Sequence, residues 1–270
     1  MKHFLPFCLP LLLLTACRIA PEETPFPDRP AESIVAEAVI TEGRTPEENY
    51  DLPTSFTTDL ALWDVQEDGP ALLTELSEAN AAFYGLDYEK ALIRWGSSLA
   101  EFDWNYGTPR GVLPQIWQFD IDGDWQDELI IDCYVGSGTG ISIEELHILE
   151  KNADNTLTAY TFPEAAWRER LWEHAVLSCG ANRGYISFGR DMVEFDIFGV
   201  PEDALKKSVE TGEIACFEVS EKNIVLKGAF CLDRESRGGL QYIADYSASI
   251  SYQDGAFLLT DFHLDGYLPQ

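Results

Sequence analysis

The stretch YSASISYQDGAFLLTDFHL, residues 246–264, decides the fold class. Apolar residues from Tyr246 to Tyr252 alternate with serines, which is the period of a half-buried β-strand. The pair Asp254-Gly255 is one of the pairs that favour a two-residue hairpin turn, and a second apolar run follows it. The sequence therefore predicts an antiparallel hairpin.

Eight further segments before this hairpin are rich in β-branched and aromatic residues and are bounded by turn residues. The predicted strands are Gln115–Phe119, Leu129–Val135, Ile141–Leu149, Leu157–Phe162, Gly184–Phe188, Met192–Ile197, Glu213–Val219 and Asn223–Leu232. No internal repeat of a propeller is evident, although the first four strands, between Gln115 and Phe162, could form a single blade-like unit.

Three segments have apolar residues at helical spacing. The first runs from Pro70 to Gly85, the second begins at Asp87 and includes Leu99, and the third runs from Pro163 to Gly180. A short helix is also expected near 201–207. We therefore expect an α+β fold, predominantly antiparallel sheet with three packed helices.

The N-terminal part of the chain differs in composition from the rest. Residues 17–60 are polar, acidic and rich in proline, which predicts a disordered tether, although 33–40 is compatible with a brief strand or helix. The expected organisation is a leader over 1–16, the tether over 17–60 and a single domain over 61–270.

The leader has the form of an export signal. Lys2 and His3 precede an apolar run from Phe4 to Leu14, and its roughly eleven residues fall short of the ~20 that cross a bilayer as a helix. The end of the run, Leu14-Thr15-Ala16-Cys17, resembles the lipobox of bacterial lipoproteins. That resemblance implies that Cys17 carries a diacylglycerol and anchors the protein to the extracytoplasmic face of a bacterial membrane. The alternative is an ordinary secretory signal with a chance cysteine.

Charge is strongly unbalanced. The chain has 18 basic and 47 acidic residues and a formal net charge of −29. Such a surface repels phosphate backbones, so nucleic acid is not an expected partner, whereas multivalent cations are compatible with it.

Four cysteines remain after the leader and Cys17, namely Cys133, Cys179, Cys216 and Cys231. An extracytoplasmic location permits disulfides. Cys216 and Cys231 lie on segments expected to be neighbouring strands and form the best candidate pair, with free, buried thiols as the alternative. The spacing suits neither zinc nor iron–sulfur ligation.

The segment DIDGDWQDE, residues 120–128, is the strongest candidate site. Calcium prefers six to eight oxygen ligands, and alternating acids let one tight loop direct several oxygens to one centre. We expect side-chain ligands from Asp120, Asp122, Asp124 and Glu128 and the backbone carbonyl of Gln126. Asp127 points outward or replaces Glu128.

The same run resembles the calcium loop of FG-GAP and VCBS-type repeats, which joins two strands of a propeller blade. The resemblance covers about a dozen residues and implies ligands at Asp120, Asp122, Asp124 and Glu128. Trp125 stands where that family commonly has glycine, and a positive φ there costs a bulky residue about 1 kcal/mol or more. The alternative is an acidic turn whose aspartates cap backbone amides.

Other features have simpler interpretations. The glycine-rich segment 136–140 lacks the Lys-Ser/Thr of a phosphate-binding loop and is expected to connect strands. The three histidines after the leader form no metal-ligand pair. The tryptophans are expected mainly in the core, with an exposed platform of Trp104, Tyr106 and Trp125 as the alternative.

These observations favour a noncatalytic binding or scaffolding module of the cell envelope with a structural calcium ion. Its partners would be the membrane, through the lipid at Cys17, and an envelope ligand or protein. The alternative function is an envelope hydrolase acting on glycan or peptide.

Overall fold

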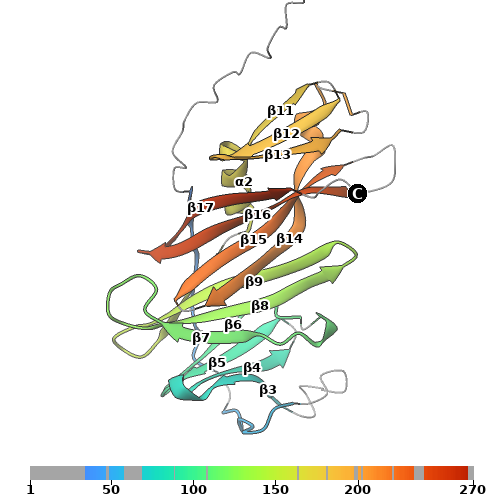
Figure 1. Cartoon of the computed structure of the whole chain (residues 1–270). Helices are drawn as coiled ribbons and strands as arrows, with labels where there is room; N and C mark the ends of the chain where they lie inside the picture. The colour runs from blue at the N-terminus through green and yellow to red at the C-terminus, as the bar shows by residue number, and fades with distance from the viewer. Residues whose placement is uncertain are drawn as a thin grey trace, which may run out of the picture.

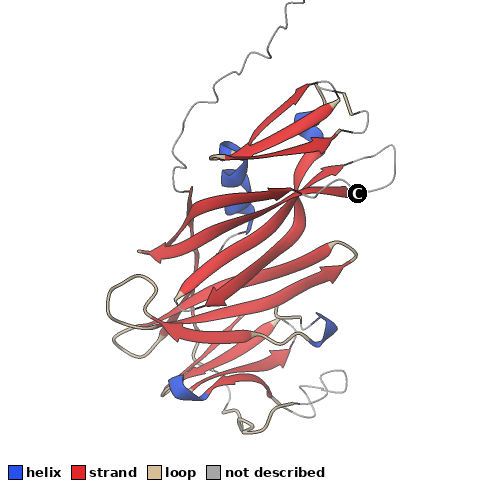
Figure 2. Ribbon diagram, in the orientation of Figure 1, coloured by secondary structure: helices blue, strands red, loops and turns tan. Residues whose placement is uncertain are grey.

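The computed structural model describes residues 34–46, 49–57, 69–87, 89–107, 109–162, 164–180, 182–197, 200–201, 203–220, 222–233 and 240–266. Strands make up 65% of it and helices 9%, so the expectation of an α+β fold with three packed helices is wrong. The chain is a mostly antiparallel β protein (Figure 2).

The strands fall into three sheets. They are β1 (Ile34–Glu37), β2 (Val39–Glu42), β3 (Ala71–Leu76), β4 (Ala81–Asp87), β5 (Lys90–Trp95), β6 (Ser98–Phe102), β7 (Gln115–Phe119), β8 (Glu128–Gly138), β9 (Ile141–Lys151), β10 (Leu157–Thr161), β11 (Val176–Gly180), β12 (Arg183–Phe188), β13 (Asp191–Asp196), β14 (Val209–Ser220), β15 (Asn223–Asp233), β16 (Leu240–Gln253) and β17 (Ala256–Gly266). The described helices are α2 (Glu164–His174), α3 (Leu205–Ser208) and the 3-10 turns η1 (Ser77–Ala79) and η2 (Pro109–Gly111). All eight strands expected between 115 and 232, and the final hairpin, are confirmed.

The ten-stranded sheet forms the centre of the molecule, between the sheets β11–β13 and β3–β6 (Figure 1). Its order is β1-β17-β16-β15-β14-β9-β10-β2, and β8 pairs with β9 and β7. One half is the meander β14–β17 and the other is built on β7–β10. Within the path the halves meet at β9 and β14, a parallel pairing of only two residue pairs, Ile214 with Ser142 and Ala215 with Ile143.

The two ends of this sheet are consecutive in sequence. β1 pairs with β17 and β2 pairs with β10, and only Ala38 separates β1 from β2. The Ala38 N–H donates to the carbonyl of Gly255, 3.1 Å away. Because one short segment covers both outer edges, the sheet must curl until its ends meet.

The four-stranded sheet replaces the first two predicted helices. β3–β6 form an antiparallel meander whose inner face, including Phe83 and Ile93, packs on β8–β10. Its outer face, including Tyr84 and Leu92, is also buried. Strands buried on both faces lose the alternation of apolar and polar residues, so residues 70–99 imitated helical spacing.

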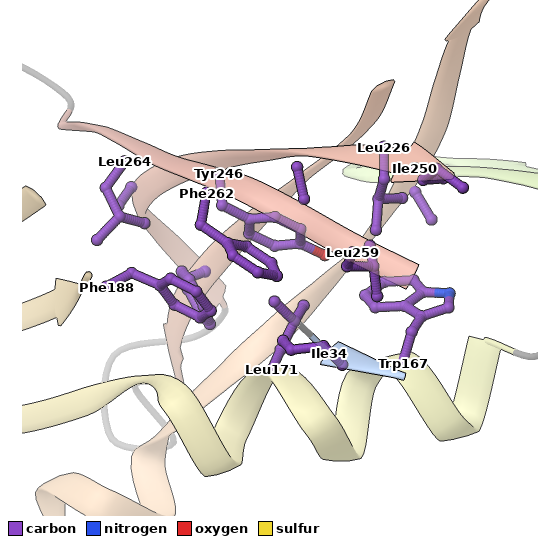
Figure 3. Packing of buried hydrophobic residues seen from close by; sticks show 14 of the residues in the cluster. Ile34, Trp167, Leu171, Phe188, Leu226, Tyr246, Ile250, Leu259, Phe262 and Leu264 are labelled. Atoms are coloured by element: carbon purple, nitrogen blue, oxygen red, sulfur yellow. The ribbon is translucent and has the colours of Figure 1, made fainter. Parts of the chain in front are cut away.

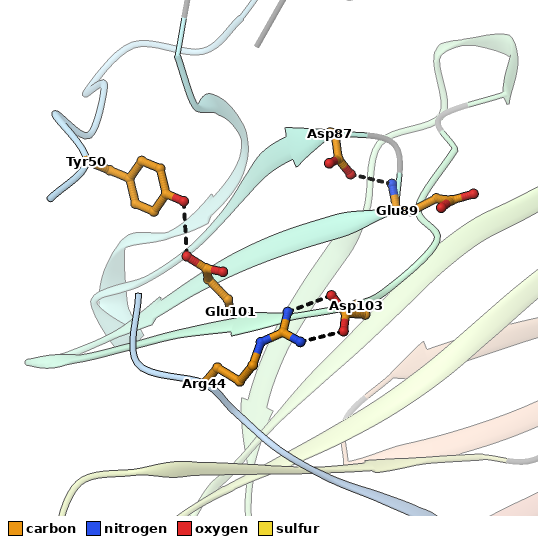
Figure 4. Close-up of polar contacts among 6 residues, drawn as sticks. All are labelled: Arg44, Tyr50, Asp87, Glu89, Glu101 and Asp103. Carbon is orange, nitrogen blue, oxygen red and sulfur yellow. Dashed lines mark hydrogen bonds and ion pairs between the residues drawn. The ribbon is translucent and has the colours of Figure 1, made fainter. Parts of the chain in front are cut away.

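The segment that covers this outer face belongs to the predicted tether. Tyr50 and Leu52 pack against the outer cluster, and the Tyr50 hydroxyl lies 3.0 Å from a carboxylate oxygen of Glu101 (Figure 4). Arg44 donates two 2.6 Å hydrogen bonds to Asp103 in the same view. The prediction of a disordered tether is therefore wrong for the described residues between 34 and 57, and residues 17–33 lie outside the described structure.

The largest hydrophobic cluster lies between the central sheet, α2 and the sheet β11–β13. Trp167 and Leu171 of α2 point toward Ile34 and Leu259, while Phe188 contacts Phe262 of β17 (Figure 3). The helix expected from Pro163 to Gly180 is thus present but ends at His174, because residues 176–180 pair with β12.

Candidate metal site

The acidic loop joins the adjacent strands β7 and β8. Phe119 pairs with Glu128, so residues 120–127 form a closed loop at the end of a hairpin. Gly123 and Trp125 have φ values of 83° and 73°, which are left-handed conformations that sharpen the turn. The sequence expectation that the loop connects two strands is confirmed.

Three of the predicted ligands converge. Asp120, Asp122 and Asp124 each offer a carboxylate oxygen, and these oxygens all lie within 4.8 Å of one another. Oxygens that share a calcium ion at 2.3–2.6 Å can be no more than about 5.2 Å apart, so the spacing fits a common cation. The donor set, three carboxylates in one exposed loop, also has the hard-oxygen chemistry that calcium prefers.

The same carboxylates accept hydrogen bonds from the loop backbone. Asp120 accepts the N–H groups of Gly123 and Trp125 at 2.7 and 3.2 Å. Asp122 accepts the Asp124 N–H at 3.0 Å, and Asp124 accepts the Gln126 N–H at 2.7 Å. These contacts are the Asx turns of the alternative interpretation. Since a carboxylate oxygen carries two lone pairs, they also hold the loop in a shape that leaves acceptor capacity for a cation.

The side chains of Glu128 and Gln126 do not belong to the group of three converging carboxylates. Glu128 is 4% exposed, and its Oε2 accepts the Ile121 N–H at 2.9 Å, so it lies outside the converging group. Burial, then repulsion from the three aspartates, raises the pKa of Glu128 to about 7 against the opposing Ile121 hydrogen bond. Gln126 donates its side-chain amide to Asp124 at 2.9 Å. Asp127 faces the strand, where Gln118 donates to it at 2.9 Å.

Trp125 is 94% exposed at the tip of the loop. Trp104 and Tyr106 are buried beside Phe83 and Phe102, so an exposed platform of Trp104, Tyr106 and Trp125 does not form. The core interpretation holds for the first two residues, and Trp125 stands apart from them.

A cleft of about 820 Å³ lies beside the loop. Two other hairpins contribute to it. Glu150 and Lys151 come from the end of β9, next to the β9–β10 turn, and Asp254 comes from the β16–β17 turn. The Lys151 ammonium lies 4.4 Å from the centre of the Trp95 ring. The cleft is also lined by Trp95, Asp122, Asp124, Gln126, Asp127, Glu128, Asn152, Ala153, Tyr160 and Gly255. The sequence did not predict this cleft because the three turns meet only in the folded chain.

The three histidines are dispersed and line no part of the cleft among the described residues. His147 is 1% exposed, stacks on Trp104 at 4.0 Å and contacts Thr161 through Nδ1 at 2.8 Å. Burial lowers the pKa of His147 to about 3, so the ring is neutral. His174 lies beside Phe188, and His263 lies 3.3 Å from Asp191. This arrangement brings no acid–base pair with histidine to the cleft.

The four cysteines of the body are thiols in the structure. Cys216 and Cys231 do lie on neighbouring strands, β14 and β15, but the register places Cys216 opposite Lys227 and Cys231 opposite Glu210. No disulfide therefore joins Cys216 to Cys231 in the structure, and of these two thiols only Cys231 is buried.

The glycine-rich segment forms the connection between β8 and β9 only in part, since residues 136–138 belong to β8 and residues 139–140 form the turn. Gly138 pairs with Ile141 across the β8–β9 turn, and no helix follows it. Cys17 and the leader lie outside the described residues. Within the described ranges, no helix has the length and apolar character to cross a membrane.

Comparisons of the chain with protein-family models, with curated proteins and with solved structures found no match. The resemblance to FG-GAP and VCBS-type loops therefore rests on the loop residues themselves.

Proposed function

We propose that this chain is an exported bacterial lipoprotein whose β body is a noncatalytic binding or scaffolding module with a calcium ion in the loop Asp120–Glu128. The observation that supports it most is the convergence of three carboxylates, from Asp120, Asp122 and Asp124, at the spacing of a shared cation. In this proposal the ion would neutralise the loop and fix the β7–β8 hairpin at the edge of the cleft.

Calcium binding is tested by titration calorimetry and thermal melting of the chain from residue 17. A ligand at 100 times its Kd stabilises the folded state by about 2.7 kcal/mol, or about 5–10 °C in a chain of this size. Magnesium serves as the comparison ion because it requires shorter, octahedral contacts.

Asp122→Asn separates the two interpretations of the loop. Asparagine keeps an oxygen to accept the Asp124 N–H but removes one charge. We expect stability in EDTA to be unchanged or slightly higher and the calcium response to be weakened or lost. Asp127→Asn is the matched control, since Asp127 faces Gln118 rather than the converging oxygens. No calcium heat and no shift in melting for the unsubstituted chain would refute the calcium part of the proposal.

The anchor is supported by the sequence of the leader and is tested separately. Intact-mass analysis of the protein extracted from its native membrane should show a chain beginning at Cys17 and carrying acyl groups. Cys17→Ala should release the protein from the membrane fraction. The substitution removes the thiol that would carry the diacylglycerol, and two acyl chains anchor a protein stably where one is marginal. An unprocessed N-terminus would contradict the proposed export.

A further inference from the structure

A pair of carboxyl groups, one buried and one half-buried, lies at the seam between the two halves of the central sheet. Asp132 of β8 and Glu144 of β9 are diagonal neighbours, because Asp132 pairs with Leu146 and Glu144 with Tyr134. Their side chains share a hydrogen bond. Asp132 is 4% exposed, and its Oδ1 has no hydrogen-bond partner among the described atoms.

Glu144 continues the pairing of β9 with β14 beyond the short backbone ladder. That ladder ends at Ala215 and Ile143, and two residues later the Phe217 N–H donates to Glu144 Oε2 at 2.7 Å. A side-chain oxygen thus takes the place of the next backbone acceptor. The Glu144 carboxylate therefore extends the contact between β9 and β14 by one hydrogen bond beyond the backbone pairing.

The surroundings provide little compensation for two negative charges. On β14 the Cys216 thiol interacts electrostatically with both carboxyl groups. Lys227 of β15 and Tyr246 and Asp245 of β16 interact with that thiol in turn. Lys227 is already paired with Glu218, and no described basic side chain forms an ion pair with Asp132 or Glu144.

We propose that Asp132 and Glu144 share one proton that holds β9 against β14, so that the seam is a pH-sensitive latch, tight in acid and looser toward alkaline pH. Two adjacent carboxylates in a buried site cannot both ionise without strong repulsion, so one remains protonated and donates to the other. Loss of that proton would push the Glu144 carboxylate away from Phe217.

The direction of the pH effect follows from the two states of the seam. Burial, and then repulsion from Glu144, raises the pKa of Asp132 to about 8 in the closed state, whereas its ordinary value is 3.8. Between these values the open state releases a proton that the closed state keeps, so opening becomes more favourable as pH rises. The effect reaches its limit once the closed pair also ionises.

Hydrogen exchange of the Phe217 amide, expressed as a protection factor at each pH, tests the latch. From about pH 5 to about pH 8 we expect protection to fall at least tenfold, with a limiting slope of about tenfold per pH unit for one proton. Amides of the β16–β17 hairpin report any global change. A pH-independent protection factor at Phe217 would overturn the proposal.

Asp132→Asn should abolish the pH dependence, because its amide still donates to Glu144 and does not titrate. If that variant fails to fold, Glu144→Gln provides the second test. Its carbonyl oxygen can still accept the Phe217 N–H, and removal of the Glu144 charge lowers the pKa of the remaining Asp132 toward the value that burial alone sets, so the fall in protection should end at a lower pH than in the unsubstituted protein. Glu218→Gln is the control, because Glu218 is a surface acid next to Phe217 on β14, and this variant should retain the unsubstituted pH profile. Retention of that profile in Asp132→Asn or in Glu144→Gln would contradict the latch. Neither residue lies in the acidic loop, so these outcomes are independent of calcium binding.

Discussion

Replacing Trp125 by glycine should stabilise the protein, although it removes a large apolar side chain. Trp125 has a φ of 73°, and five of the eight described non-glycine residues with positive φ are asparagine or aspartate, which tolerate this conformation. The left-handed conformation costs an ordinary residue about 1–2 kcal/mol. Because the side chain is 94% exposed, its removal sacrifices almost no packing.

The net effect is smaller than the strain, because glycine is also freer in the unfolded chain. That entropy opposes folding by about 0.5–1 kcal/mol. We therefore expect Trp125→Gly to raise the free energy of unfolding by about 0.5–1 kcal/mol, which corresponds to about 1–4 °C in melting temperature.

The assay is urea unfolding followed by far-ultraviolet circular dichroism, with and without calcium. Trp125→Ala is the matched control, since alanine removes the indole but keeps the β-carbon that makes the conformation costly. It should resemble the unsubstituted protein. If the glycine variant is no more stable than the alanine variant, the argument from backbone strain is wrong.

Two further substitutions test the core. His147 is buried, and its pKa is lowered to about 3, so the ring is neutral in the folded protein. The free energy of unfolding should therefore be at its full value above about pH 6.5 and should fall below that pH by up to about 1.4 kcal/mol per pH unit. Urea titrations of His147→Gln should no longer show this slope. A β-carbon at Gly228 would lie 2.2 Å from the Tyr246 hydroxyl oxygen, so Gly228→Ala should destabilise by about 1–3 kcal/mol in thermal melting. Gly180→Ala, where a β-carbon meets nothing within 4 Å, should be nearly neutral, and equal effects of both alanines would contradict the packing described.

The strands of the second half of the chain could be predicted because each shows a local signal. The β16–β17 hairpin has one buried face, and its Asp254-Gly255 turn has positive φ at both residues, as the expected turn type requires. β8 is buried on both faces, but its continuous apolar run between turn residues still indicated a strand.

The errors in the first half are physically linked. The outer face of β3–β6 is apolar because residues 49–57 cover it, and that covering segment was predicted to be tether. If residues 49–57 are taken as a tether, the outer face of this sheet would be exposed to solvent, and the apolar side chains of Tyr84 and Leu92 do not fit such a face. A helix with one apolar side was then the natural interpretation of 70–99.

In the candidate site too, the features that are local in sequence could be predicted and those that depend on distant segments could not. The loop is local in sequence, so Asp120, Asp122 and Asp124 could be predicted together and do converge. The cleft and the Asp132–Glu144 pair depend on which turns and strands become neighbours, and no spacing within one segment reports that. The candidate pair Cys216 and Cys231 shows the same limit. Their strands β14 and β15 are neighbours, as expected, but the register, which the sequence does not specify, places neither cysteine opposite the other.

The single-residue link at Ala38 makes the alignment of two distant strand pairs mutually dependent. Ile34 is fixed opposite Leu259 on one side of the link, and Val39 opposite Thr161 on the other. Successive side chains of a strand point to opposite faces, so adding or deleting one residue here would invert the inward and outward positions of one partner or the other. Sequence variation at this link should therefore keep its length, even where the residue itself changes.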